Sequence, residues 1–219
     1  MKFKQGDIIA IPLLHNLGYA YAKIILPHEF IKCDEQIMLK VFDYRSESIV
    51  KDIEVTTNQD FFINPLLLAG TPRLRGGNKC TIIGNTNLKE EDFVIPDFKE
   101  HPKIYEECRK FTNESEMSAM WFIAKNLQVI WNEKYDYNAV RHLEMWGNTG
   151  YDLQIVRITM EFLRKDGKII TDYFPELLLD SKNSSDYMFE EWKKYVYFLV
   201  KSSVPYPQIP KEIRGRAIE

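Results

Sequence analysis

The side chains in this sequence best suited to acid–base or metal chemistry are four histidines: His15, His28, His101 and His142. Glu29 follows His28, and Glu144 lies two residues after His142, so each histidine has an acidic neighbour that makes a candidate acid–base pair. No two histidines have the His-Glu-x-x-His spacing, which places two metal ligands on one helix face. We therefore expect structural or surface histidines, without a metal site or a cofactor.

No sequence motif indicates a catalytic nucleophile. The three cysteines are far apart and form no Cys-x-x-Cys pair: Cys33, Cys80 and Cys108. The sequence has no Gly-x-Ser-x-Gly elbow, and residues 76–79 (Gly-Gly-Asn-Lys) lack the spacing of a Walker phosphate loop. We assign no catalytic residue and expect a protein that acts without catalysis.

Arginine and aromatic residues in turns are the best candidates for contacts with a partner, because such side chains often anchor protein interfaces. Arg73 and Arg75 flank Leu74 in a Gly- and Pro-rich loop, and Tyr151 follows a polar, glycine-containing turn. We predict that Arg73, Arg75 and Tyr151 bind a partner. The alternatives are a solvated loop for the arginines and a core position for Tyr151.

The charge of the chain argues against a nucleic-acid partner. The net charge is −3, whereas nucleic-acid binding relies on clustered Lys and Arg side chains. The acidic balance suits a basic protein partner. An RNA-binding barrel that uses Arg73 and Arg75 remains an alternative.

Short strands are expected in the N-terminal part of the chain, because apolar runs of strand length alternate there with turn signals. The expected strands cover residues 7–13, 19–25, 37–42, 49–55 (a weaker pattern), 65–68 and 79–84. This arrangement predicts a small antiparallel β-barrel of the SH3-like type. Polar residues punctuated by prolines follow, so we place a domain boundary near residue 100 and predict two domains, 1–100 and 101–219.

The second domain is expected to mix helices and strands, which makes the chain α+β. We predict a short helix over 104–111, a hairpin over 121–131, and a helix capped by Asp136 that runs to Trp146. Residues 153–174 fit both strand and helix patterns, and Asp166-Gly167 favours a hairpin with a type I′ turn. A final helix begins at Ser184 or Ser185 and precedes an extended, proline-rich tail. Its inward-facing residues are expected to be Met188, Trp192, Tyr195, Val196 and Leu199.

The N-terminal segment lacks the apolar stretch of a signal peptide, and no apolar run in the sequence reaches membrane-spanning length. We therefore expect a cytoplasmic protein with reduced thiols and without a membrane partner.

Several segments of the N-terminal half resemble the bacterial immunity protein 26 family. A Gly-Asp pair precedes an apolar strand that ends in Pro-Leu, and Gly-Tyr-Ala opens the return strand. The similar segments are Gly6–Leu13, Gly18–Ile24, Ile82–Asn85 and, after Leu88, Ile95–Phe98. The resemblance covers residues 3–98.

The resemblance implies a bacterial protein that binds and blocks a cognate protein toxin delivered between cells. Some relatives are described as phosphotriesterases, so a metal-dependent hydrolase is the alternative from another class. That alternative requires clustered His, Asp or Glu ligands in the folded protein.

Overall fold

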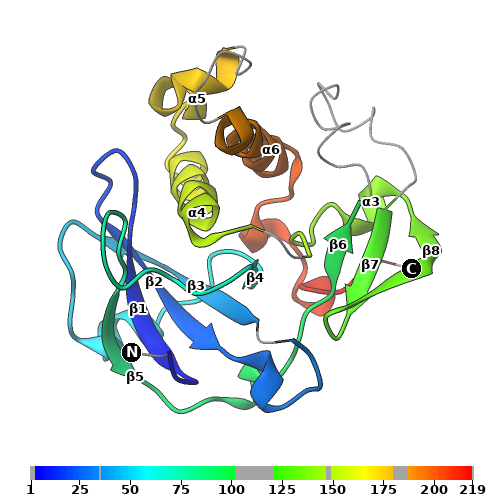
Figure 1. Cartoon of the computed structure of the whole chain (residues 1–219), viewed down its shortest axis with the longest axis horizontal. Coiled ribbons are helices and arrows are strands. Elements are labelled where there is room, and N and C mark those ends of the chain that lie inside the picture. Colours follow the sequence, from blue (N-terminus) through cyan, green and yellow to red (C-terminus); the bar gives the residue numbers. More distant parts are fainter. Residues whose placement is uncertain (1–2, 35, 102–120, 147–148, 180–186, 219) are drawn as a thin grey trace.

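A computed structural model of the chain describes residues 3–34, 36–101, 121–146, 149–179 and 187–218 (Figure 1). The strands are β1 (Asp7–Pro12), β2 (Tyr19–Ile25), β3 (Ile37–Ser46), β4 (Leu66–Leu68), β5 (Thr81–Asn85), β6 (Phe98–Glu100), β7 (Trp121–Lys125) and β8 (Gln128–Tyr135). The α-helices are α1 (Ile53–Thr57), α3 (Tyr137–Val140), α4 (Tyr151–Lys165), α5 (Ile170–Tyr173) and α6 (Tyr187–Ser202). The 3-10 helices are η1 (Pro27–Glu29), η2 (Glu90–Asp92), η4 (Pro175–Leu178), η6 (Tyr206–Gln208) and η7 (Lys211–Ile213).

The first five strands form one antiparallel sheet in the order β4-β3-β2-β1-β5, which confirms the α+β class and most of the expected strands. A tight turn joins β1 to β2, and the Leu13 N–H donates to the Gly18 carbonyl at 2.8 Å. Gly18 has a φ of +85°, and a Cβ there would lie 2.1 Å from the Ser46 carbonyl oxygen. Only glycine therefore allows this close approach to β3.

Two details of the expected sheet differ in the structure. No strand covers residues 49–55, because the Asp52 carboxylate accepts a hydrogen bond from the Glu54 N–H at 3.0 Å and starts α1. The sheet is open, with β4 and β5 at its two edges and no pairing between them in the described part of the chain. The SH3-like barrel is thus not confirmed.

Both faces of the five-stranded sheet are covered, which explains why β1 is an unbroken apolar run instead of an alternating one. Helix α4 covers one face and places Ile155, Ile158 and Phe162 against the sheet (Figure 1). On the other face, Tyr21 and Phe42 pack against side chains of residues 49–61.

The region 153–174 forms helix α4 followed by a short helix, so the expected hairpin is wrong. Helix α4 is buried on two sides, because a second stripe that includes Val156, Met160 and Leu163 packs against α6. Gly167, with φ of +66°, ends the helix, and the next N–H bonds back to the Leu163 carbonyl at 2.9 Å. The Asp-Gly pair is therefore a helix C-terminus instead of a hairpin turn.

The hairpin expected over 121–131 is confirmed as β7 and β8, with Asn126 and Leu127 at positive φ in the turn. Strand β6 pairs with β7, so the second sheet has the order β6-β7-β8. Asp136 caps α3 as expected, but α3 ends at Val140 and not near Trp146. The helix expected over 104–111 lies outside the described residues.

Helix α6 packs between α4 and the second sheet, with Tyr195, Val196 and Leu199 buried as expected. Met188 is 63% exposed, which contradicts its expected inward position, because Phe189 takes the inward place. The serines expected to cap this helix lie outside the described residues.

The C-terminal tail is not simply extended, because η6 and η7 bend it back to residue 97. There, the Asp97 N–H donates to the Gly215 carbonyl at 2.8 Å, and the Ala217 N–H donates to the Asp97 carboxylate at 3.1 Å. Among the described helices, none has the length and apolarity needed to cross a bilayer.

Candidate partner-binding site

The loop that joins β4 to β5 holds both arginines that the sequence predicts to bind a partner. Pro72 is buried and Leu74 is half-buried, so the intervening chain directs Arg73 and Arg75 outward. The Cys80 N–H donates to the Arg73 carbonyl at 2.8 Å and closes the part of the loop between these two residues. The arginines are therefore exposed on a loop whose backbone is anchored.

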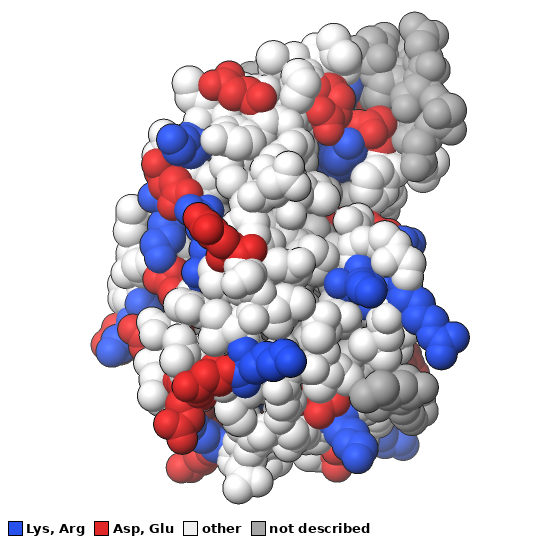
Figure 2. Space-filling model, turned by 90° about the vertical axis from the view of Figure 1, so that its left-hand side faces the viewer, with Lys and Arg blue, Asp and Glu red and all other residues white. Residues whose placement is uncertain are grey.

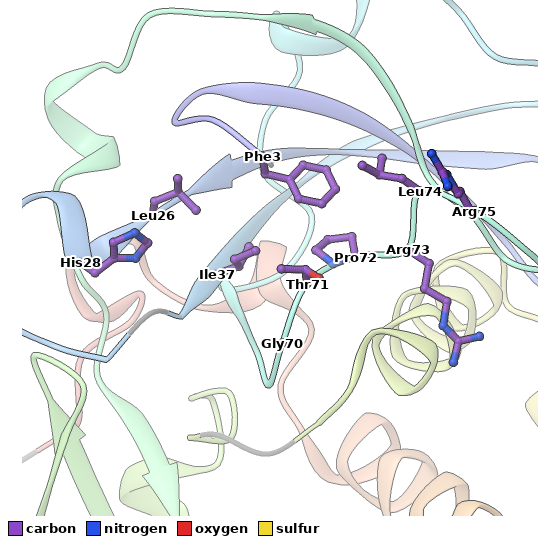
Figure 3. Close-up of a pocket in the computed structure, with 10 residues that line it drawn as sticks. All are labelled: Phe3, Leu26, His28, Ile37, Gly70, Thr71, Pro72, Arg73, Leu74 and Arg75. Carbon is purple, nitrogen blue, oxygen red and sulfur yellow. The ribbon is translucent and has the colours of Figure 1, made fainter. Parts of the chain in front are cut away.

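One side of this loop borders a hollow of about 850 Å³ on the protein surface (Figure 3). Most of its lining is apolar, and in Figure 3 His28 lies at one end and the two arginines lie at the other. The lining residues are Phe3, Leu26, His28, Ile37, Gly70, Thr71, Pro72, Arg73, Leu74 and Arg75. A volume of this size falls within the ~300–1,000 Å³ range of pockets that enclose ligands.

The two arginines differ in their partners. The Arg73 side chain extends towards α4, and its Nη2 lies 2.6 Å from the Asp152 carboxylate (Figure 3). This side chain is nevertheless 56% exposed, so part of its guanidinium faces solvent. Arg75 is exposed and makes no ion pair with any residue that the structure describes.

Tyr151, the third predicted contact residue, is only 6% exposed and lies in the core between α4 and the sheet. Burial, followed by the neighbouring Cys80, raises the pKa of Tyr151 above its ordinary value. A buried side chain offers little area to a partner, so its position favours the core alternative that the sequence left open.

The four histidines are not brought together. His15 lies in a turn against the Phe174 ring, and His28 lies at the end of the hollow. His101 is buried against Trp121, and His142 is buried where its Nε2 lies 2.5 Å from the Arg216 carbonyl oxygen. Within the described residues, no three His, Cys, Asp or Glu side chains gather closely enough to hold a metal ion.

Neither candidate acid–base pair forms. The His28 Nδ1 is buried without a hydrogen-bond partner, so it is not paired with Glu29. Glu144 binds Arg157 instead of His142. Burial lowers the pKa of His142, as desolvation of an imidazolium must, and this favours the neutral ring.

Sequence reasoning missed a buried ion cluster on α4, which consists of Arg157, Glu144, Glu161 and Arg164. Arg157 Nη2 lies 2.9 Å from Glu144, its Nη1 binds Glu161, and Arg164 Nη2 lies 2.5 Å from Glu161. Burial alone would lower the pKa of Arg157, but the carboxylates of Glu144 and Glu161 raise it above its ordinary value. The i, i+4 spacing of Arg157 and Glu161 and the i, i+3 spacing of Glu161 and Arg164 are the sequence signals for this cluster.

A second buried charge cluster lies on the opposite face of the sheet. Lys23 and Lys40 are directly opposite each other on β2 and β3, and like charges in such a pair repel. The fully buried Asp92 carboxylate lies 2.7 Å from Lys23 and 3.1 Å from Lys40 and compensates that repulsion. The cluster attaches η2 to the sheet, so its role is structural.

Glu100 at the end of β6 gives the stability of the protein a distinctive pH dependence. Burial raises the pKa of Glu100 to about 7, although its carboxylate accepts a hydrogen bond from the His101 N–H at 2.9 Å. Because the folded-state pKa lies above the ordinary value of 4.5, this group stabilises the fold fully below about pH 4.5. That stabilisation is lost as the pH rises through about 7.

We therefore expect the Glu100→Gln variant to lose a pH-dependent contribution of about 1–2 kcal/mol to the free energy of unfolding, after discounting for partial exposure. Urea-induced unfolding at about pH 4.5 and about pH 8 measures this contribution to the free energy of unfolding. The wild-type protein must be compared with the variant, because the lowered pKa of His142 acts in the opposite direction. Glu29→Gln at an exposed site is the control, and an unchanged profile in Glu100→Gln would contradict the prediction.

The described cysteines are poor nucleophiles. Cys80 is buried, and burial raises its pKa to about 11, so the thiol stays protonated at neutral pH. Burial, followed by the charge of Asp34, also raises the pKa of Cys33.

The family model Immunity protein 26 matches residues 4–108 of the chain. This match assigns residues 4–108 to the immunity protein 26 family. The matched region contains the entire five-stranded sheet and the loop that carries Arg73 and Arg75. Among curated proteins and among solved structures, nothing significantly similar to the chain was found.

Proposed function

We propose that this immunity protein 26 relative neutralises a cognate toxin in the cytoplasm by binding it stoichiometrically, without catalysis. The family match supports an immunity role, and the hollow beside the β4–β5 loop supports a surface for binding. The observation that carries the proposal is the apolar hollow bordered by Arg75, an exposed arginine without an ion-pair partner in the described residues.

The hollow has features typical of the centre of a protein–protein interface. Apolar side chains provide area that a partner can cover, and arginine is one of the residue types most enriched among strong contact residues. The tie between Cys80 and Arg73 reduces the conformational entropy that the loop would lose on binding.

The charge distribution favours a protein partner over RNA. On the face shown in Figure 2, acidic and basic side chains intermingle, with wide uncharged areas between them. A continuous basic surface, which nucleic-acid binding needs, is not present on that face.

We expect Arg75→Glu to weaken toxin binding by about 2 kcal/mol, or roughly 30-fold, because a charge of the wrong sign replaces an interface arginine. The measurement uses a candidate toxin chosen from the products of the neighbouring genes. Growth is compared when the toxin is expressed with wild-type or variant protein, and affinity is measured by calorimetry with a catalytically inactive toxin.

Lys51→Glu is the matched control, because Lys51 is also exposed and precedes α1 on the opposite face of the sheet. It should protect cells as well as the wild type does. If wild-type protein neither protects cells nor binds that toxin, the proposed function is wrong.

A further inference from the structure

The hollow is basic although the chain as a whole is acidic. Among the described residues that line it, the ionisable side chains are His28, Arg73 and Arg75, and none is acidic. From this we infer that the hollow receives a segment of the protein partner that carries an apolar side chain next to a carboxylate. This inference rests on the proposed function and specifies the chemistry of the partner.

The apolar part of the site comes from residues that are distant in sequence. Phe3 lies before β1, Leu26 directly follows β2, and Ile37 begins β3. Pro72 and Leu74 line the hollow from the loop (Figure 3). Covering such a surface releases water and stabilises a complex by about 25 cal/mol for each Å² of apolar area buried. A polar or fully charged segment would gain little here.

The charged part of the site is able to bind a carboxylate. A guanidinium has five N–H donors, and Arg75 commits none of them to an acidic side chain in the described residues. Asp152 pairs with Arg73 from the α4 side, and the Arg73 side chain is still more than half exposed. A carboxylate beside Arg75 would accept two parallel hydrogen bonds, the geometry that arginine favours.

The local charge also changes what the net charge of the chain implies. A net charge of −3 suggests a basic partner, but a basic segment would meet repulsion at this hollow. The segment of the toxin that enters the hollow is therefore acidic and apolar, whatever the charge of the rest of its surface.

The test uses 3-phenylpropionate, a carboxylate with an apolar ring, and the neutral 3-phenylpropionamide of nearly the same shape. Each probe is titrated into the full-length protein, and amide chemical shifts are followed by NMR. We expect the carboxylate to shift resonances of residues 70–75 and Phe3, and to bind about tenfold more tightly than the amide. Arg75→Gln should remove that preference, and Lys51→Gln should keep it.

Equal binding of the two probes would overturn the inference, as would the absence of shifts around the hollow. Binding of a ten-residue oligouridylate that is lost in Arg75→Gln would also overturn it, in favour of a nucleic-acid partner. Because these probes contain no toxin, their failure leaves the protection assay intact and is distinguishable from failure of the proposed function.

With the inactive toxin, single Asp and Glu residues on its surface can be changed to Lys and measured against the Arg75→Glu variant. We expect one such change to raise the affinity of the Arg75→Glu variant for the toxin at least about tenfold. The introduced lysine on the toxin would pair with the introduced glutamate, which re-forms the ion pair with its charges exchanged. If Arg75→Glu binds the toxin as tightly as the wild type does, the inference fails while the proposed function stands.

Discussion

Replacing Arg157 with methionine is expected to lower the free energy of unfolding by about 3–5 kcal/mol, because it leaves the Glu144 carboxylate without its counter-charge and removes one of the two cationic partners of Glu161. The Arg157 side chain is 6% exposed and holds Glu144 and Glu161 together at the centre of the molecule. Methionine fills a similar volume, so the loss reports on charge instead of on a cavity. Urea-induced unfolding followed by tryptophan fluorescence measures the change.

Two further variants make this result specific. Lys165→Met removes an ion pair to Asp43 at the exposed end of the same helix, and it should cost at most about 1 kcal/mol. Adding Glu144→Gln to Arg157→Met should recover part of the loss, because it removes a carboxylate that the first change leaves unpaired. A loss below about 1 kcal/mol in Arg157→Met would show that the cluster is not important for stability.

Phe162→Ala is expected to destabilise the protein by about 3–5 kcal/mol, the usual cost of removing a buried phenylalanine ring. Phe162 projects from α4 onto the five-stranded sheet and stacks on Phe62 with a centroid separation of 4.2 Å. The change therefore opens a cavity between the immunity protein 26 region and the C-terminal region. Thermal and urea unfolding provide the measurement.

Ile169→Ala is the matched control, because Ile169 is also apolar but 65% exposed, and it should change stability by less than about 0.5 kcal/mol. A chain that ends at residue 108 extends the same test. It lacks α4, so the face of the sheet that includes Ile9, Ile11 and Ala22 would be open to water. We expect this fragment to be unfolded or aggregated, and a stable monomer would show that the domain boundary near residue 100 separates independent units.

Local sequence determined most of the N-terminal strands and both turns of the confirmed hairpins. The residues involved act on their neighbours: Gly18 permits the tight turn after β1, and Asn126 adopts the positive φ between β7 and β8. The Asp136 cap could likewise be predicted, since its hydrogen bond reaches only two residues ahead. The family resemblance also followed from short local segments and is confirmed over residues 4–108.

The region 153–174 shows where local pattern was insufficient. Its apolar residues satisfy both strand and helix periodicity, and the helix forms because the sheet and α6 bury two different stripes of it. Likewise, Tyr151 could be judged exposed or buried from sequence, and only the packing of α4 on the sheet places it in the core. A periodicity specifies which residues share a face but not how many faces will be covered.

Only part of the candidate site could be predicted from the sequence. Arg73 and Arg75 stood out because a Gly- and Pro-rich loop exposes its charged residues, and the structure places both beside the hollow. Phe3, Leu26 and Ile37 gave no signal, since they lie more than thirty residues before the loop and meet it only after the sheet forms. The sequence by itself therefore determined which loop carries the charged side chains. Only the tertiary structure decided that these side chains border an apolar hollow, because a concave surface exists only where distant segments pack together.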